Sequence, residues 1–119
     1  MKYAFESPDG SSVYIYFDSE VFKGIERRVY DAGHLQAGPM PYMVQTILNI
    51  YGVFEVAVEG NFACIERYDD TEPFHRIAER VAEKVRELCF AGIVPIQRLP
   101  MWEFRKRYPG IVAREPPVE

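Results

Sequence analysis

Hydrophobic and polar residues alternate most regularly in the stretch from Val53 to Tyr68. In its first half, Phe54, Val56 and Val58 alternate with Glu55, Ala57 and Glu59. Gly60-Asn61 interrupts the alternation, and residues 62–68 resume it. Two-residue hairpin loops favour residues that tolerate a positive φ angle, as Gly and Asn do. The pattern therefore predicts a β-hairpin with strands at 53–59 and 62–68.

A turn at Gly60-Asn61 determines which residues of the two strands face each other. Pairing outward from the turn puts Val58/Ala63 and Val56/Ile65 on one face, and Glu59/Phe62, Ala57/Cys64 and Glu55/Glu66 on the other. The first set is apolar throughout, so we expect it to form the core beneath the helices. The second set faces away from the helices, although it includes Phe62 and Cys64.

A second hairpin is predicted near the N-terminus. Ser7-Pro8-Asp9-Gly10 has the composition of a turn and separates the apolar run Tyr3–Phe5 from residues 12–17, which are rich in β-branched and aromatic side chains. Residues 27–31 could add a short strand. Alternation along residues 12–17 sends either Tyr14 and Tyr16 or their neighbours to the open face, and the tyrosine hydroxyls favour the first choice.

Two segments have helical periodicity. In the first, Pro41 suits the opening turn, Gly52 is placed to end the helix, and the apolar positions are Met40, Val44, Ile47, Leu48 and Tyr51. The second runs from about Glu72 to Phe90, with Asp70 or Thr71 as cap and Gly92 beyond its end. Its apolar arc consists of Phe74, Ile77, Ala78, Val81, Val85, Leu88 and Cys89.

These elements predict an α+β fold of two layers. An antiparallel sheet of about four strands carries two helices on one face, in ββαββα order, followed by a C-terminal extension. A length of 119 residues suits one hydrophobic core. We place the domain at 1–97 and the extension at 98–119. The extension contains Met101, Trp102, Phe104 and Tyr108 and could pack on the sheet.

Charge and composition exclude several function classes. The net charge of −4 argues against a nucleic-acid binder, because phosphate contacts depend on basic side chains. No apolar run approaches the length of a membrane span, and the N-terminus resembles a strand rather than a signal peptide. The two cysteines, Cys64 and Cys89, are expected to be buried free thiols. We therefore expect a cytoplasmic protein without membrane contact.

No catalytic, cofactor-binding or metal-binding residues are predicted. Glu72 and His75 have the i, i+3 spacing of di-iron carboxylate sites, but a single pair is not enough, and a solvated surface explains them. His34 lies in a glycine-flanked connector and is expected on the surface. Phosphate-binding glycine motifs and the nucleophile-elbow motif are absent from the sequence.

The chain resembles the N-terminal domain of Nfu/NifU-type iron–sulfur scaffold proteins. Four segments carry the resemblance over roughly residues 1–90: Glu6–Gly10, Val13–Phe17, Ile47–Val56 and Asn61–Ile65. In that family the cluster is bound by a C-x-x-C motif on a separate C-terminal domain, and this sequence has no such motif. The resemblance therefore implies a stand-alone accessory domain that contacts partner proteins and binds no cluster.

Two departures from the family limit this transfer. The family's asparagine-rich first turn is replaced here by Pro-Asp-Gly-Ser-Ser, and the tail from Ile93 onward has no counterpart. Residue-level roles are accordingly not carried over at the first turn.

The open sheet face is the place where we expect contact with a partner. Tyr14, Tyr16, Ala57, Phe62 and Cys64 are its candidate contact residues. Three arrangements would explain an aromatic face: the tail covers it, a second copy or another protein covers it, or it is exposed. RNA stacking is disfavoured because Glu55, Glu59 and Glu66 would repel phosphates.

Two functions remain open from the sequence. The first is a non-enzymatic protein-interaction or accessory domain, linked to iron–sulfur cluster assembly, whose partner is another protein or a second copy. The second is a small-molecule-binding domain or an enzyme whose site is assembled from residues distant in the sequence. A closed pocket with converging polar groups would favour the second.

Overall fold

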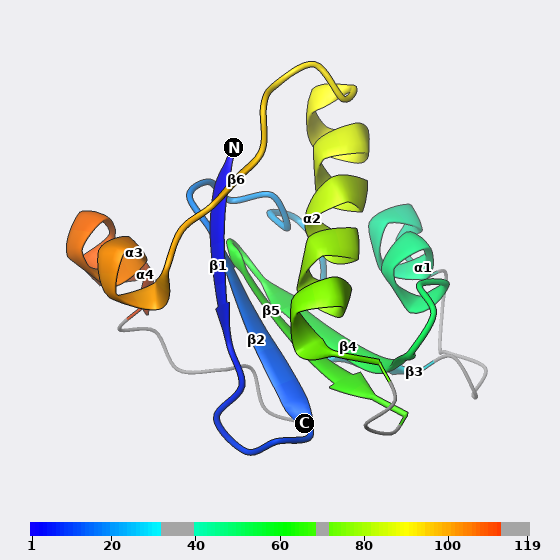
Figure 1. The fold of residues 1–119 in the computed structure, drawn as a ribbon. Coiled ribbons are helices and arrows are strands. Elements are labelled where there is room, and N and C mark those ends of the chain that lie inside the picture. The colour runs from blue at the N-terminus through cyan, green and yellow to red at the C-terminus, as the bar shows by residue number, and fades with distance from the viewer. Residues whose placement is uncertain (32–39, 69–71, 113–119) are drawn as a thin grey trace.

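The fold is a single mixed sheet with helices on both faces (Figure 1). It comes from a computed structural model that describes residues 1–31, 40–68 and 72–112. The strands are β1 (Lys2–Glu6), β2 (Ser12–Phe17), β3 (Val29–Asp31), β4 (Val53–Glu59), β5 (Phe62–Arg67) and β6 (Gln97–Arg98). The helices are α1 (Tyr42–Leu48), α2 (Phe74–Phe90), α3 (Met101–Arg107) and α4 (Pro109–Val112).

The α+β class is confirmed, but the sheet is larger than predicted. Its order is β3-β4-β5-β2-β1-β6, six strands rather than about four. The expected short strand near residue 30 is present as β3, which pairs with β4. The additional strand β6 pairs with β1 in parallel, so the sheet is mixed rather than purely antiparallel. No described helix is long and apolar enough to cross a membrane.

The predicted register of the β4–β5 hairpin is confirmed. Val58 pairs with Ala63, Ala57 with Cys64, and Glu59 with Phe62 across the turn. Gly60 has φ +60°, the conformation for which a glycine is suited at this turn. Further from the turn, an irregularity between Val53 and Glu55 shifts the pairing. Phe54, which alternates in sequence with the buried Val56 and Val58, is 38% exposed at this irregularity.

The main core lies between the sheet and helices α1 and α2. Val56, Val58, Ala63 and Ile65 are completely buried there, as predicted from the hairpin. From β2, the alternate residues Val13, Ile15 and Phe17 join them. Figure 1 shows both helices over the same side of the sheet, with α3 and α4 standing apart beyond β1.

Helix α1 is shorter than its apolar spacing predicts. Val44, Ile47 and Leu48 are buried, but the helix ends at Leu48. Tyr51 then lies in a turn and is 70% exposed, so its predicted core position is wrong. Gly52 has the expected left-handed conformation, with φ +94°, but it follows that turn rather than ending the helix directly.

Helix α2 uses only the first part of its predicted apolar arc. Ile77, Ala78, Val81 and Val85 are buried, together with Ala82. Leu88 is 39% exposed and Cys89 is exposed, so the predicted burial of both is wrong. The predicted caps Asp70 and Thr71 lie outside the described residues.

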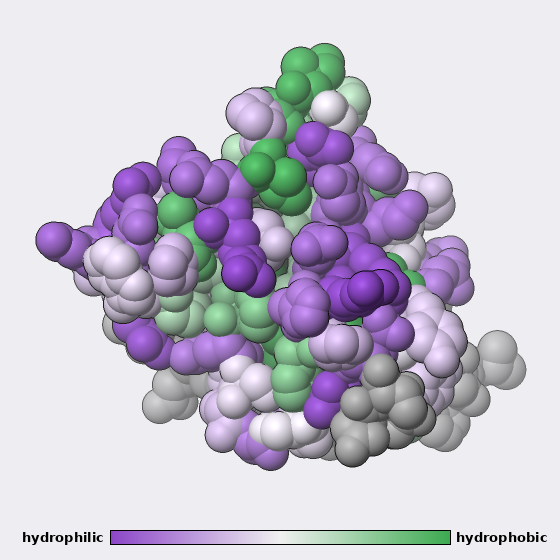
Figure 2. All heavy atoms as spheres, viewed as in Figure 1, coloured by the Kyte–Doolittle hydropathy of each residue, from purple (hydrophilic) through white to green (hydrophobic). Residues whose placement is uncertain are grey.

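The last turn of α2 and the loop after it extend beyond the core. Ala91 and Gly92 both have positive φ angles and terminate the helix. Ile93, just past them, is 83% exposed. Figure 2 shows polar residues over the outer side of α2 and hydrophobic residues gathered past its C-terminal end.

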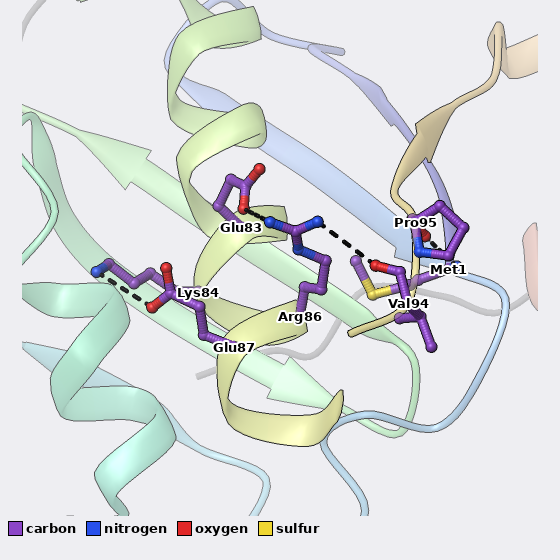
Figure 3. Close-up of polar contacts among 7 residues, drawn as sticks. All are labelled: Met1, Glu83, Lys84, Arg86, Glu87, Val94 and Pro95. Atoms are coloured by element: carbon purple, nitrogen blue, oxygen red, sulfur yellow. Dashed lines mark hydrogen bonds and ion pairs between the residues drawn. The ribbon is translucent and has the colours of Figure 1, made fainter. Parts of the chain in front are cut away.

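The segment after α2 returns to the sheet along its β1 edge. Arg86 bridges the Glu83 carboxylate, at 2.8 Å, and the Val94 carbonyl, at 3.4 Å (Figure 3). The Met1 amino group donates to the Pro95 carbonyl at 2.7 Å. These contacts hold residues 94 and 95 next to the sheet, directly before β6 and α3.

Candidate binding site

The face predicted to contact a partner is largely covered by the chain's own C-terminal segment. Phe62, Tyr16 and Ala57 are 1%, 4% and 5% exposed, whereas Tyr14 and Cys64 are half-buried. Phe104 of α3 is fully buried against this face, and its ring lies 6.3 Å from that of Tyr16. Of the three arrangements considered, the structure shows the first one for this part of the sheet.

The aromatic side chains of this face form a second, smaller core. Its buried members are Ala4, Tyr16, Phe62, Leu99 and Phe104. The Phe62 ring lies 5.4 Å from that of Tyr14 in an edge-on arrangement and 5.0 Å from that of Tyr16, to which it is tilted by 47°. Trp102 was expected among the covering residues but is 67% exposed, because the adjoining positions of α3 face the sheet instead.

Hydrogen bonds and ionic contacts also attach α3 to this face. Glu6 accepts a hydrogen bond from the Tyr16 hydroxyl at 3.1 Å and one from Arg105 of α3 at 2.7 Å. Burial is the main cause that raises the pKa of Tyr16, and the nearby Glu6 carboxylate raises it further. The Tyr16 hydroxyl therefore keeps its proton at neutral pH and donates a hydrogen bond to Glu6.

Cys64 is poorly suited to chemistry in this setting. Burial raises the pKa of its thiol to about 11, and the carboxylate of Glu66 adds to the shift. A thiol with so high a pKa is neutral at physiological pH, and the neutral form is a weak nucleophile and metal ligand. We therefore assign Cys64 a packing role.

The remaining candidates for chemistry are dispersed. His75 is exposed, and Cys89 contacts the Val21 carbonyl at 3.7 Å from an exposed position. Glu72 was expected on a solvated surface, but its side chain is only 13% exposed and pairs with Arg80. His34 lies outside the described residues. Within the described parts of the chain, no group of three or more potential ligands could hold a metal ion.

A hollow that combines cations with neutral polar groups lies between α1 and α2. Its volume is about 430 Å³, within the range of small binding pockets. Helix α1 and the turn after it supply Tyr42, Gln45, Thr46, Asn49, Ile50 and Tyr51. Helix α2 supplies Arg80 and Lys84. We call this hollow the interhelical cleft.

The cleft follows from the geometry of two helices packed side by side. Tyr42, Gln45 and Thr46 of α1 and its C-cap residue Asn49 have the spacing i, i+3, i+4 and i+7, so they share one face. Arg80 and Lys84 are one turn apart on α2. Figure 3 shows Lys84 and its partner Glu87 on the side of α2 toward α1, away from the Arg86 bridge.

Glu72 orients one of the two cations in the cleft. Its carboxylate lies 3.0 Å from the Nη1 atom of Arg80. Glu72 itself packs against Gly52, where an added Cβ would lie 3.1 Å from the Cβ of Glu72. Gly52 thus allows the close approach that places Glu72 beside Arg80.

Exposed aromatic side chains lie on the cleft and beside the turn that follows α1. Tyr42 and Tyr51, both 70% exposed, flank the cleft, and Tyr68 is 66% exposed. The Tyr68 amide donates to the Gly52 carbonyl at 3.0 Å, and its ring lies 5.8 Å from that of Phe54. We call Tyr42, Tyr51, Phe54 and Tyr68 the aromatic rim.

The sequence contained a partial signal for this site. Gln45, Thr46 and Asn49 stand on the polar side of α1 in the periodicity, and the basic pair at 80 and 84 lies outside the apolar arc of α2. Neither observation shows that the two polar faces meet. That meeting depends on how α1 and α2 pack on the sheet.

Comparisons with known proteins add no relative. No family model matches this sequence, and no match was found among curated proteins or solved structures.

Proposed function

We propose that this chain is a non-enzymatic protein-interaction module whose contact surface is the aromatic rim. The observation that carries the proposal is the exposure of four large aromatic side chains, of which Tyr42 and Tyr51 line the cleft, while Phe54 and Tyr68 pair beside the turn that contains Tyr51. Aromatic side chains that remain exposed to water contribute little to the stability of the fold. Tyrosine and other aromatic residues are enriched in protein–protein interfaces, where they supply much of the binding energy.

The rim replaces the open sheet face as the proposed contact surface. Three of the five residues first considered there are already buried, and two of them, Tyr16 and Phe62, belong to the second core with Phe104 of α3. A partner would have to displace Phe104 to reach them, and that would cost most of the second core. The rim needs no such rearrangement.

The proposal can be tested by comparing what two variants retain from a cell extract. A Tyr51→Ser/Tyr68→Ser double variant removes two rim side chains. Trp102→Ser is the matched control, because Trp102 is equally exposed but lies on α3. We expect proteins that bind the unaltered chain and the Trp102→Ser variant but not the double variant. Identical recovery by all three, with unchanged circular dichroism, would overturn the proposal.

A link to iron–sulfur cluster assembly is a finer proposal that rests on the sequence resemblance alone. Recovery of cluster-assembly proteins with the unaltered chain, lost in the rim double variant, would support it. Their absence from the recovered proteins would count against the link while leaving the interaction module intact. Stoichiometric iron after anaerobic purification would contradict the prediction that the chain itself binds no cluster.

A small-molecule-binding function is the second candidate, and the volume of the interhelical cleft favours it. Its lining contains two cations and several neutral polar groups but no carboxylate. Such a pocket would take an anionic ligand, which the experiment in the next subsection includes as a separate outcome.

A further inference from the structure

The two cations of the interhelical cleft indicate the chemistry of the partner. Arg80 and Lys84 line it from one side, and Gln45, Thr46 and Asn49 line it from the other. The Thr46 hydroxyl already donates to the Tyr42 carbonyl at 2.9 Å, and one N–H of Gln45 donates to the Met40 carbonyl at 2.7 Å. Arg80, Lys84, Asn49 and the second N–H of Gln45 remain able to donate to a ligand, and no acidic side chain is part of the lining that the structure describes. An arrangement of donors without acids is complementary to a carboxylate.

The existing partners of the two cations leave capacity for an incoming anion. Lys84 lies 3.6 Å from Glu87, but both side chains are about half exposed, so the pair is weak and easily exchanged. Arg80 is paired with Glu72 through Nη1, and a guanidinium has five N–H donors. One carboxylate therefore does not exhaust the donors of Arg80.

The surroundings of the cleft restrict the direction from which an acidic group can enter. Glu79, Glu83 and Glu87 lie beside the same two cations around a shallower hollow on α2. Their negative charge repels an acidic segment that approaches over α2. An acidic segment that approaches over α1 meets the neutral side chains Gln45, Thr46 and Asn49 and is not repelled. This path also passes Tyr42 and Tyr51, the two residues of the aromatic rim that line the cleft.

The rim also determines what should accompany the acidic group. Tyr42 and Tyr51 flank the cleft, and Ile50 forms an apolar part of its wall while being 8% exposed. An apolar or aromatic side chain next to the carboxylate would bury surface against these residues. A free anion would leave the rings unused.

We infer that the interhelical cleft binds an acidic peptide segment of the partner protein, with a Glu or Asp carboxylate on Arg80 and Lys84 and a neighbouring aromatic residue on the rim. This inference rests on the proposed function, because it names the partner chemistry of the same surface. It differs from that proposal in depending on charge.

Defined peptides test the inference without knowledge of the natural partner. The probe is Ac-Gly-Phe-Glu-Glu-Gly-NH₂, and its neutral counterpart replaces both Glu by Gln. Amide shifts of ¹⁵N-labelled protein report binding during titration to millimolar concentration. We expect shifts at Thr46, Asn49, Arg80 and Lys84 with the acidic peptide, weaker binding of the neutral one, and loss of affinity with added salt.

Charge variants provide the second measurement. Lys84→Gln should weaken binding of the acidic peptide by about tenfold or more, the scale expected for losing a hydrogen bond to a charged group. Lys106→Gln is the matched control, because Lys106 is exposed on α3, remote from the cleft. Both positions are on helix surfaces, so neither change should affect folding.

Each outcome decides between defined alternatives. Equal binding of the acidic and neutral peptides, or no shifts at all, would overturn the acidic-segment inference. In that case, the interaction module would still be supported if the Tyr51→Ser/Tyr68→Ser variant failed to recover the proteins that the unaltered chain recovers from the extract. Only the acidic-segment inference would then be wrong. Glutarate that shifts the same amides as strongly as the acidic peptide would overturn the peptide assignment in favour of a small anionic ligand.

Discussion

Gly52 lies directly against the side chain of Glu72, so closely that a Cβ at Gly52 would stand 3.1 Å from the Cβ of Glu72. The same glycine has φ +94°, a conformation that side chains with a Cβ rarely adopt. Glu72 continues the contact to Arg80 at 3.0 Å. A single glycine therefore supports both the turn after α1 and one cation of the cleft.

We expect Gly52→Ala to destabilise the fold by more than its backbone conformation alone requires. Gly10→Ala is the matched control, because Gly10 has φ +79° but no atom within 4 Å of an added Cβ. The control should lose about 1–2 kcal/mol, the cost of a left-handed L-residue. Gly52→Ala should lose roughly 1 kcal/mol or more beyond that, from overpacking against Glu72. Urea unfolding of both variants measures the difference, and equal losses would contradict the role of the contact.

Removing Phe104 should open the second core. This residue is fully buried, so Phe104→Ala should cost about 3–5 kcal/mol and raise the fluorescence of a dye that binds exposed apolar surface. Trp102→Ala, at the neighbouring but exposed position, should change stability by less than about 0.5 kcal/mol. A Phe104→Ala protein with unchanged stability and dye binding would show that α3 does not stabilise the sheet.

The two hydrogen bonds accepted by Glu6 should differ in their contribution to stability. Arg105→Ala removes an exposed ion pair, worth less than about 1 kcal/mol. Glu6→Ala also leaves the buried Tyr16 hydroxyl without its acceptor, which should cost about 1–3 kcal/mol. Thermal or urea unfolding distinguishes them. A larger loss in Arg105→Ala would assign the attachment of α3 to the ion pair instead.

Stability should fall at alkaline pH because of Cys64. Its thiol has a pKa of about 11 in the fold against 9.0 as the reference value. Below pH 9 both states hold the proton and the thiol has no effect. Between pH 9 and 11 the unfolded chain ionises while the folded chain does not, so the free energy of unfolding should decrease, by at most about 2 kcal/mol because solvent screens part of this half-buried site.

Cys64→Ala isolates this contribution. Cys89 and the tyrosines titrate in both the unaltered protein and the variant, so their effects cancel in the difference between the two. The difference in stability between the two proteins should change across this pH interval and be constant below it. Urea unfolding at a series of pH values measures that difference. A constant difference up to pH 11 would contradict the raised pKa.

Local patterns were sufficient to predict the hairpins and the inner face of the sheet. The register around Gly60-Asn61 was predictable because strand side chains alternate with a period of two, and the turn leaves one pairing that buries Val56, Val58 and Ile65 together. The same periodicity placed Tyr14 and Tyr16 on the second face, where they are found.

The elements that were missed depend on residues far away in the sequence. Gln97 and Arg98 have no apolar pattern, and they form a strand only because β1 offers an unpaired edge to them. Leu88 and Cys89 satisfy the helical period, but the sheet does not extend beneath the last turns of α2. The cleft likewise needs the relative placement of α1 and α2, which neither helix specifies by itself.

The pairing of β6 with β1 has a consequence for synthesis on the ribosome. The five-stranded part of the sheet can assemble once α2 has emerged, but the outer edge of β1 and the rings of Tyr16 and Phe62 await residues that are translated later. During that interval a nascent chain presents an open strand edge beside an apolar surface, a combination prone to intermolecular pairing. Pairing of β6 with β1 and packing of Phe104 on Tyr16 and Phe62 cover both features once the C-terminal segment has emerged.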